Sequence, residues 1–413
     1  MILKNILFNY SGTGLVGLIN IISLSIYVKL FGHENWGLIA TYVALLNLVM
    51  MAELGISQIY ISEYGKTQDK KILFRTYQLA IGLVAAMAIS ITMVGLVIYN
   101  ISTKSNNNVY QEWTIILLSM TLAGLNLINN FYYTNLIAKQ NMIEQNVRWV
   151  SFVLIKNILA LVLISCVSTM PIMYFVAFCF VSFIEIFSNE WSVRDIKTHK
   201  KLGVSDILAI IKKCGKLSLA IAVGVLVFNL DRLVLPMLID TATFGVYAAV
   251  TTVGLYFLQL QYPITKALFP YMAKKMHLES TSGGRLVFQQ SFLLGVLMGP
   301  PLVVAAIYSK NILNLYSVPQ ELMASANWLF DGILLAVLIN AIYHVFYMRM
   351  VIESKAIAIF IINVTAFSIT FGILLWEGGA APFLAGTACW ILASCVQLFG
   401  AIGFYHIGVN RVS

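Results

Sequence analysis

Residues 217–239 read LSLAIAVGVLVFNLDRLVLPMLI, an apolar stretch that contains two adjacent charges, Asp231 and Arg232. A helix over these 23 residues is roughly 34 Å long, which is enough to cross the hydrocarbon core of a bilayer. A charge at that depth costs at least a few kcal/mol, so charges inside such a helix point to function. The stretch therefore predicts a membrane-spanning helix with functional charges.

The composition extends this prediction to the whole chain. Hydrophobic residues make up 60% of the 413 residues and charged residues 10%, against about 25% charged residues in soluble domains. Mean hydropathy is +0.86. The five cysteines lie in or beside apolar segments and form no CxxC pair, so we expect them to pack as small apolar side chains and to bind no metal. The chain is therefore expected to be a polytopic membrane protein without a soluble domain.

Apolar segments of membrane length recur along the sequence and predict twelve spans. They cover residues 10–31, 36–61, 76–101, 113–137, 149–168, 171–191, 217–239, 245–265, 286–308, 325–348, 356–376 and 382–407. The predicted fold class is therefore an all-α polytopic membrane protein with twelve transmembrane helices.

The basic residues predict the orientation of these spans. With the N-terminus in the cytoplasm, cytoplasmic segments receive 21 of the 26 Lys and Arg residues and the opposite side receives 3, while Lys156 and Arg232 fall within spans. Positively charged loops remain on the cytoplasmic side. Both termini are therefore expected to be cytoplasmic. This asymmetry also accounts for the net charge of +9, so we expect no nucleic-acid partner.

A shift of the sequence against itself by 208 residues gives a local match. The matched pairs are Leu30 with Leu238, Trp36 with Phe244, Gly37 with Gly245, Ala40 with Ala248, and Lys66 with Lys274. Parallel repeats of this kind are typical of transporters in which two lobes enclose a central path. We predict an N-terminal lobe over 1–205 and a C-terminal lobe over 206–413, joined by the basic linker 192–216, most of which belongs to the first lobe.

Four polar residues in the span 113–137 follow a helical spacing. Asn126, Asn129, Asn130 and Tyr133 occur at i, i+3, i+4 and i+7, which places them on one face of a helix. Asparagine is costly against lipid, so this face contacts protein or a water-filled cavity. Two interpretations remain open, namely hydrogen bonding between helices and a cavity wall that binds sugar hydroxyls.

Cations within the spans suggest an anionic substrate. Arg232, Lys156 and Lys29 would form a positive path, and cations in a low dielectric attract phosphate strongly. Arg232 and Lys156 are each close enough to a span end that snorkelling to the interface is an alternative. Adjacent side chains on a helix diverge by roughly 100°, so Asp231 and Arg232 are expected to have different roles.

Acidic residues within the spans are candidates for coupling or gating. Asp231 is expected to bind a neighbouring helix or a proton, and Glu53 and Asp331 lie in the predicted spans 36–61 and 325–348. For Glu53, a polar contact between helices is an equally good interpretation.

Known enzyme motifs are absent from the sequence. Gly65-Lys66-Thr67 resembles the end of a phosphate-binding loop, but Tyr60 stands where that loop requires glycine. There is no HExxH or GxSxG motif. The longest predicted outer loop, 309–324, is short for a membrane polymerase or ligase. We therefore expect a transporter that uses no cofactor and not an enzyme.

Several short segments resemble the polysaccharide-export family, which includes the Wzx-type O-antigen flippases. The family belongs to the multidrug/oligosaccharidyl-lipid/polysaccharide exporter superfamily, with the multidrug and toxin extruders and the lipid II flippase. The segments are YVKLFGHENWGLIA at 27–40, ELGIS at 53–57, NLDR at 229–232, FGVY at 244–247 and FP at 269–270.

This resemblance implies a flippase in the bacterial inner membrane. Its substrate would be an undecaprenyl-diphosphate-linked repeat unit of O-antigen or a related polysaccharide, moved from the cytoplasmic to the periplasmic leaflet by alternating access. Arg232 and Lys156 would be candidates for contacts with the diphosphate or with acidic sugars. The implied partners are this lipid-linked oligosaccharide, membrane lipids, a polysaccharide polymerase and a chain-length regulator.

A different function in the same broad class also remains open. An ion-coupled exporter of small cationic or amphipathic molecules, similar to multidrug extruders or major facilitators, would use Glu53, Asp231 and Asp331 as its binding groups. In that case Arg232 would have no evident role.

Overall fold

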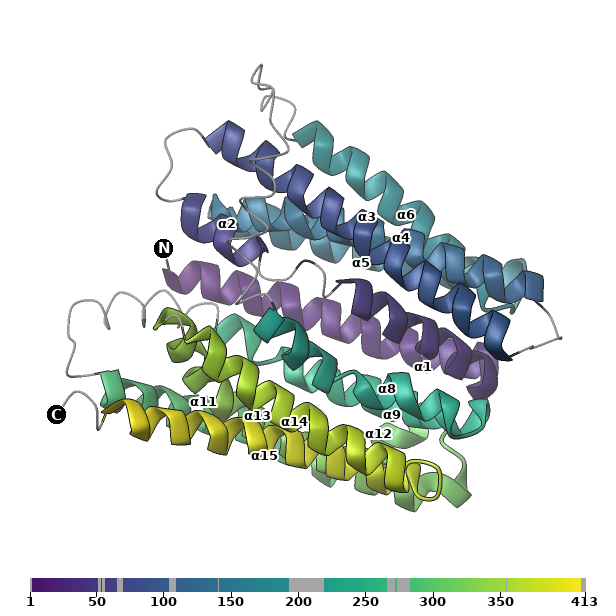
Figure 1. Cartoon of the computed structure of the whole chain (residues 1–413). Helices are drawn as coiled ribbons and strands as arrows, with labels where there is room; N and C mark the ends of the chain where they lie inside the picture. The colour runs from purple at the N-terminus through teal and green to yellow at the C-terminus, as the bar shows by residue number, and fades with distance from the viewer. Residues whose placement is uncertain are drawn as a thin grey trace. The chain divides into compact units, whose positions relative to one another are not determined.

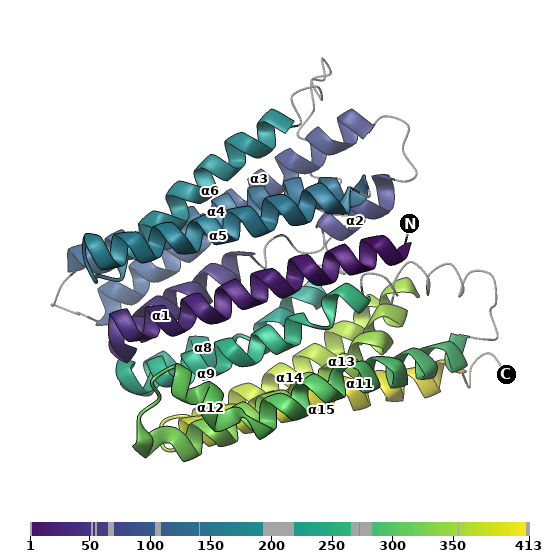
Figure 2. The same cartoon turned by 180° about the vertical axis from the view of Figure 1, so that it is seen from behind.

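The protein is described by a computed structural model (Figures 1 and 2). It describes residues 2–50, 53, 56–64, 70–103, 109–139, 141–192, 219–265, 272, 283–353 and 355–409. Within these ranges the regular secondary structure is helical and no strand occurs.

The helices labelled in Figure 1 follow one another along the chain. They are α1 (Ile2–Met50), α2 (Ile56–Tyr64), α3 (Lys70–Thr103), α4 (Val109–Ala138), α5 (Met142–Cys166), α6 (Ile172–Ser192), α8 (Leu230–Val234), the 3₁₀ helix η2 (Leu235–Met237), α9 (Thr241–Gln259), α11 (Gly283–Ile307), α12 (Ser309–Leu315), α13 (Gln320–Ile352), α14 (Ala356–Glu377) and α15 (Pro382–Val409). In the described part of the chain, nine helices are long and apolar enough to cross a membrane, and a bent pair makes a tenth. The chain is therefore an all-helical, multi-pass membrane protein, as predicted. The number of twelve spans and the cytoplasmic position of both termini stay predictions.

The stretch 217–239 is not the continuous helix that its apolar composition predicts. Leu219–Val227 and Leu230–Met237 meet at an angle of 69°. At the break, the side chain of Asn229 donates a hydrogen bond to the carbonyl of Val225 at 2.9 Å. Proline has no N–H for the helical ladder, and Pro236 lies in the 3₁₀ turn that ends the second piece. The prediction of one continuous helix is therefore wrong: the side chain of Asn229 bonds to the backbone at the break, and Pro236 ends the second piece.

A kink lies at the boundary between the first two predicted spans. Helix α1 runs from Ile2 to Met50 with a kink at Gly32, whose φ of 73° and ψ of 168° lie outside the helical region. Glycine adopts positive φ readily because it has no Cβ. The predicted turn between 31 and 36 is therefore this kink, and the described helix that follows begins at Ile56.

Contacts between residues divide the chain into two compact units. The first unit comprises Met1–Gly37 and Val223–Ser413, and the second comprises Leu38–Ala222. In the first unit, α13 packs against α15, α11 and α9. In the second unit, α6 packs against both α4 and α5, and α3 packs against α4. The predicted lobes 1–205 and 206–413 stay a prediction.

Within the first unit, two glycines form a close helix crossing. A Cβ atom on Gly37 would lie against the carbonyl oxygen of Thr241 and 3.0 Å from the backbone nitrogen of Gly245, and one on Gly245 would overlap the carbonyl of His33. The shift of 208 residues relates Gly37 to Gly245 and His33 to Thr241. The two contacts are therefore equivalents of each other, and both depend on the absence of side chains, as is common where membrane helices pack closely.

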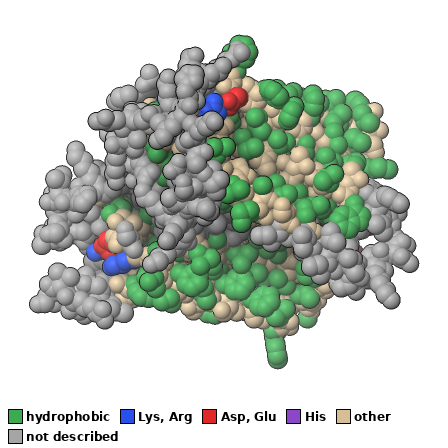
Figure 3. Space-filling view, turned by 45° about the horizontal axis from the view of Figure 1, so that its top comes forward, with side chains coloured by type: hydrophobic (Ala, Val, Ile, Leu, Met, Phe, Trp, Pro, Cys, Tyr) green, Lys and Arg blue, Asp and Glu red, His purple; other side chains and the backbone are tan. Residues whose placement is uncertain are grey.

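Large apolar side chains cover much of the surface. Figure 3 shows hydrophobic side chains over wide parts of one face. Trp376 is 83% exposed and Phe288 is 72% exposed. Exposure on this scale in the helices suits a protein whose solvent is lipid rather than water.

Candidate functional site

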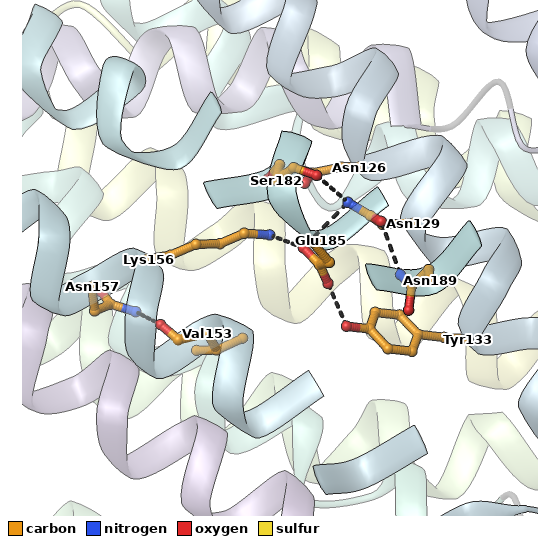
Figure 4. Close-up of polar contacts among 9 residues, drawn as sticks. All are labelled: Asn126, Asn129, Tyr133, Val153, Lys156, Asn157, Ser182, Glu185 and Asn189. Carbon is orange, nitrogen blue, oxygen red and sulfur yellow. Dashed lines mark hydrogen bonds and ion pairs between the residues drawn. The ribbon is translucent and has the colours of Figure 1, made fainter. Parts of the chain in front are cut away.

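A buried carboxylate, Glu185, is the centre of a polar cluster in the second unit. Helix α6 places its side chain, only 2% exposed, beside α4 and α5. Glu185 accepts hydrogen bonds from the Lys156 ammonium at 2.7 Å, from the Asn129 amide at 3.2 Å and from the Tyr133 hydroxyl (Figure 4). These three donors replace the water that the carboxylate loses on burial. We call Glu185, Lys156, Asn129, Tyr133 and Asn189 the Glu185 cluster.

Amide side chains fix the position of the donors around Glu185. The amide of Asn189 donates to the side-chain oxygen of Asn129 at 3.0 Å, and the Asn129 amide also donates to the carbonyl of Ser182 at 3.0 Å. One turn away, the Ser182 hydroxyl donates to the Asn126 side chain at 3.3 Å. Three members of the polar face predicted for 113–137 therefore bond directly to α6, as in the first of its two interpretations, whereas Asn130 donates to Glu53.

The Lys156 side chain is 11% exposed and forms an ion pair with Glu185. A charged pair of this kind is stable inside a protein only when good geometry and further hydrogen bonds offset the lost hydration. The structure therefore directs the Lys156 ammonium to protein and not to the membrane interface.

Glu53 forms a second polar group in the same unit. Its carboxylate accepts a hydrogen bond from the Ser57 hydroxyl and one from the Asn130 amide at 3.4 Å. Thr134 donates to the Ser57 hydroxyl at 3.1 Å. Asn130 is exposed, whereas Glu53 and Ser57 are half-buried and Thr134 is buried, so the group extends from the surface into the second unit. The described donors to Glu53 are neutral.

In the first unit, Asp231 is held by three donors. The Tyr247 hydroxyl lies 2.6 Å and the Trp390 indole nitrogen 3.0 Å from one carboxylate oxygen, and the backbone N–H of Arg232 lies 2.9 Å from the other. Asp231 is 3% exposed. A small cavity, of about the volume of one water molecule, adjoins this carboxylate. Asp231 therefore joins the broken span to α9 and α15, which agrees with its predicted contact with neighbouring helices.

The side chain of Arg232 has different partners. It is 5% exposed, and one of its terminal nitrogens donates to the hydroxyls of Thr251 at 2.9 Å and Thr252 at 3.2 Å. Its Nε is buried and has no hydrogen-bond partner among the described residues. Arg232 also takes part in none of the ion pairs found there. The guanidinium is therefore buried against neutral hydroxyls and does not snorkel.

Two further predicted residues lie apart from these groups. Lys29 is exposed on α1. Asp331 on α13 accepts a hydrogen bond from the Asn327 amide at 2.9 Å. Because Lys29 and Arg232 belong to the first unit and Lys156 to the second, the cationic path stays a prediction.

Glu185, Tyr247 and Trp390 were not among the predicted site residues. The contact of Glu185 could have been predicted, because Lys156 and Glu185 have opposite charges and lie at similar distances from the turn predicted at 168–171, which places them at the same depth on neighbouring helices. The roles of Tyr247 and Trp390 could not have been predicted, since aromatic residues are frequent in spans. In the part of the chain that the structure describes, no group of His, Cys, Asp and Glu could hold a metal ion.

Solved structures with the same fold are membrane transporters. The chain is similar to the MATE transporter VcmN of Vibrio cholerae (D35N mutant), with a TM-score of 0.63, 14% identity, and coverage of 98% of this chain and 94% of that one. The eukaryotic MATE transporter AtDTX14 gives a TM-score of 0.66 at 14% identity, over 98% and 95% of the chains. The lipid II flippase MurJ, in an inward closed conformation, gives 0.64 at 14% identity, over 95% and 87%. At this identity, the likeness establishes the fold.

The family is established by a sequence match. No curated protein matches the chain. A family model described as polysaccharide biosynthesis protein matches residues 2–276, which is well over half of the chain. The predicted resemblance is therefore confirmed: this chain belongs to the polysaccharide biosynthesis protein family.

Proposed function

We propose that the chain is a flippase for a lipid-linked oligosaccharide, with an undecaprenyl diphosphate anchor, in the bacterial inner membrane. It would move O-antigen or a related repeat unit from the cytoplasmic to the periplasmic leaflet, by alternating access of its two lobes through twelve spans. The family match and the flippase among the similar structures support this proposal. The polymerase and chain-length regulator that act on the flipped product would be its partners.

One observation carries the proposal, namely the environment of Arg232. Its guanidinium is buried, its described side-chain bonds go to the hydroxyls of Thr251 and Thr252, and the carboxylate of Asp231 is bonded by Tyr247 and Trp390. A guanidinium suits phosphate because it is always charged and can donate two parallel hydrogen bonds. We therefore assign Arg232 a contact with the diphosphate, in a conformation that opens the site to the substrate.

Sugar recognition would use side-chain amides of α4. Asn126 and Asn130 on α4 each carry an NH2 donor group and a carbonyl acceptor, which suits hydroxyl groups. Asn130 is exposed, so it is the better placed of the two. Lys29, exposed on α1, would attract anionic substrate groups, while Glu53, Asp231 and Asp331 would serve coupling or gating.

A gene deletion with complementation tests the proposal. Deletion in the native host is expected to abolish surface polysaccharide and to cause lipid-linked repeat units to accumulate in the cytoplasmic leaflet. Wild-type protein should restore export, Arg232→Lys should restore part of it, and Arg232→Ala should restore little at matched protein levels. Arg349→Ala is the control, because Arg349 forms an ion pair with Glu353 at the end of α13, at 2.6 Å. Normal surface polysaccharide after the deletion would overturn the proposal.

A second candidate function is an ion-coupled exporter of small cationic or amphipathic molecules. The similar MATE structures favour it, as does Glu53, whose described donors are the neutral groups of Ser57 and Asn130. This function predicts that the deletion sensitises cells to cationic dyes and leaves surface polysaccharide intact. The same deletion strain therefore separates the two functions.

A further inference from the structure

The ion pair in the Glu185 cluster bears on how Lys156 could bind an anion. While its ammonium lies 2.7 Å from the Glu185 carboxylate, its charge is balanced by that group (Figure 4). A diphosphate that binds Lys156 must therefore compete with Glu185. The question is what happens to the carboxylate when the lysine leaves it.

Without Lys156, Glu185 would keep only neutral donors. These are the Tyr133 hydroxyl and the Asn129 amide, and the carboxylate itself is 2% exposed. A buried carboxylate that has lost its cation is strongly disfavoured, because two neutral hydrogen bonds do not replace hydration and a counter-charge. Uptake of a proton from the aqueous phase removes the charge and leaves a carboxylic acid that can still accept both hydrogen bonds.

The other charged groups near the cluster have partners of their own. Helix α4 presents Tyr133 to Glu185, and helix α5 presents Lys156. Arg148 of α5 is paired with Glu144 at 2.8 Å, and it also donates to the side-chain oxygen of Asn189 in the cluster at 3.3 Å. Glu190 of α6 is paired with Arg75 of α3 at 3.1 Å and bonded by Tyr132, and the Cys179 thiol of α6 lies near Lys156. Among the described residues, no second cation is bonded to Glu185.

We propose that Lys156 and Glu185 form an exchangeable ion pair, in which a diphosphate group that binds Lys156 causes Glu185 to take up one proton. Anion and proton enter together, so the net charge of the cluster changes by less than the charge of the substrate. The two binding events are thermodynamically linked, and each strengthens the other by the same factor. This proposal rests on the proposed function, since it takes the lipid-linked diphosphate as the anion.

Binding measurements on the purified full-length protein in detergent test the proposal. The probe is farnesyl-diphospho-N-acetylglucosamine, a diphosphate diester whose charge stays constant from about pH 6 to about pH 8.5. Wild-type affinity should fall as pH rises, by up to about 10-fold per pH unit for one coupled proton. Calorimetry in buffers of different ionisation enthalpy should show uptake of close to one proton per probe bound.

Substitutions assign the proton to Glu185. Glu185→Gln resembles the protonated acid, so this variant should bind the probe without pH dependence and, at high pH, more tightly than wild type. Glu190→Gln is the matched control, because Glu190 lies on the same helix and also bonds a tyrosine and a cation. It should keep the wild-type pH profile. Lys156→Gln, a second variant, should bind weakly and without pH dependence.

The outcomes separate the coupling from the function. Probe binding without proton uptake in wild type, or an unchanged pH slope in Glu185→Gln, overturns the coupling and leaves the flippase proposal standing. Failure of wild type to bind the probe at every pH overturns both. Loss of pH dependence in Glu185→Gln, with its retention in Glu190→Gln, supports the exchangeable pair.

Discussion

Replacement of Gly245 by alanine should destabilise the first unit through the glycine crossing. The new methyl group would overlap the carbonyl of His33 on α1. Because the obstacle is backbone and not the end of a flexible side chain, the two helices must move apart. Inserting a methyl group into well-packed structure costs about 1–3 kcal/mol, and we expect the upper part of this range, about 3 kcal/mol. Gly37→Ala should behave alike, since its methyl group would meet the carbonyl of Thr241.

Glycines elsewhere on α1 provide the matched control. A Cβ atom on Gly14 or Gly17 would have no neighbouring heavy atom within 4 Å. Alanine is the better helix former, so Gly14→Ala and Gly17→Ala should be neutral or should stabilise the protein by about 0.5–1 kcal/mol. The same substitution on one helix is thus expected to have opposite signs at different positions.

Thermal unfolding of the full chain in detergent measures these effects. A loss of about 3 kcal/mol should lower Tm by roughly 6–12 °C, at 2–4 °C per kcal/mol for units of this size. Gly14→Ala should leave Tm unchanged or raise it slightly. An unchanged Tm in both Gly37→Ala and Gly245→Ala would refute the close crossing. Equal losses in all four variants would show that the effect comes from glycine replacement in general.

The remaining predictions concern single hydrogen bonds in the first unit. Tyr247→Phe removes a donor from buried Asp231 and should cost about 1–3 kcal/mol in thermal unfolding, whereas Tyr308→Phe, at an exposed residue, should have no effect. Asp240→Ala removes the N-terminal cap of α9, whose carboxylate accepts from the Thr243 backbone N–H at 2.8 Å, and should cost about 1 kcal/mol. That backbone hydrogen bond holds the pKa of the Asp240 carboxyl below its usual value. The stabilisation is therefore present above about pH 4 and is lost as pH falls through the lowered pKa, so the difference from Asp240→Asn should shrink in acid.

Much of the fold could be predicted from the sequence, because lipid imposes strong rules on a chain. Apolar segments of membrane length must be helical, so the all-helical class follows from composition. The break near Asn229 could not be predicted from hydropathy, which counts apolar residues and ignores local bonding between side chain and backbone. Pro236 was visible, but it lies so near the end of the segment 217–239 that the length alone favours a single helix.

The candidate site could be predicted only where sequence spacing reports proximity. Of the four residues predicted to share one face, Asn126, Asn129 and Tyr133 bond to one neighbour, α6, whereas Asn130 bonds to Glu53. The partners of Asp231 could not be predicted in this way, since Trp390 lies 159 residues away and contacts across that separation depend on the packing of the whole unit. Side chains on distant helices meet through tertiary structure, which periodicity within one helix does not report.

Flipping by the purified protein in lipid vesicles tests the central claim most directly. A fluorescent farnesyl-diphospho-N-acetylglucosamine is placed in both leaflets, and a reagent confined outside the vesicles quenches only the probe that reaches the outer leaflet. Vesicles with wild-type protein should lose the signal of the inner leaflet much faster than protein-free vesicles. Vesicles with Arg232→Ala should resemble the protein-free sample, and vesicles with Arg349→Ala should resemble wild type. Wild-type vesicles that flip the probe no faster than protein-free vesicles would contradict the account.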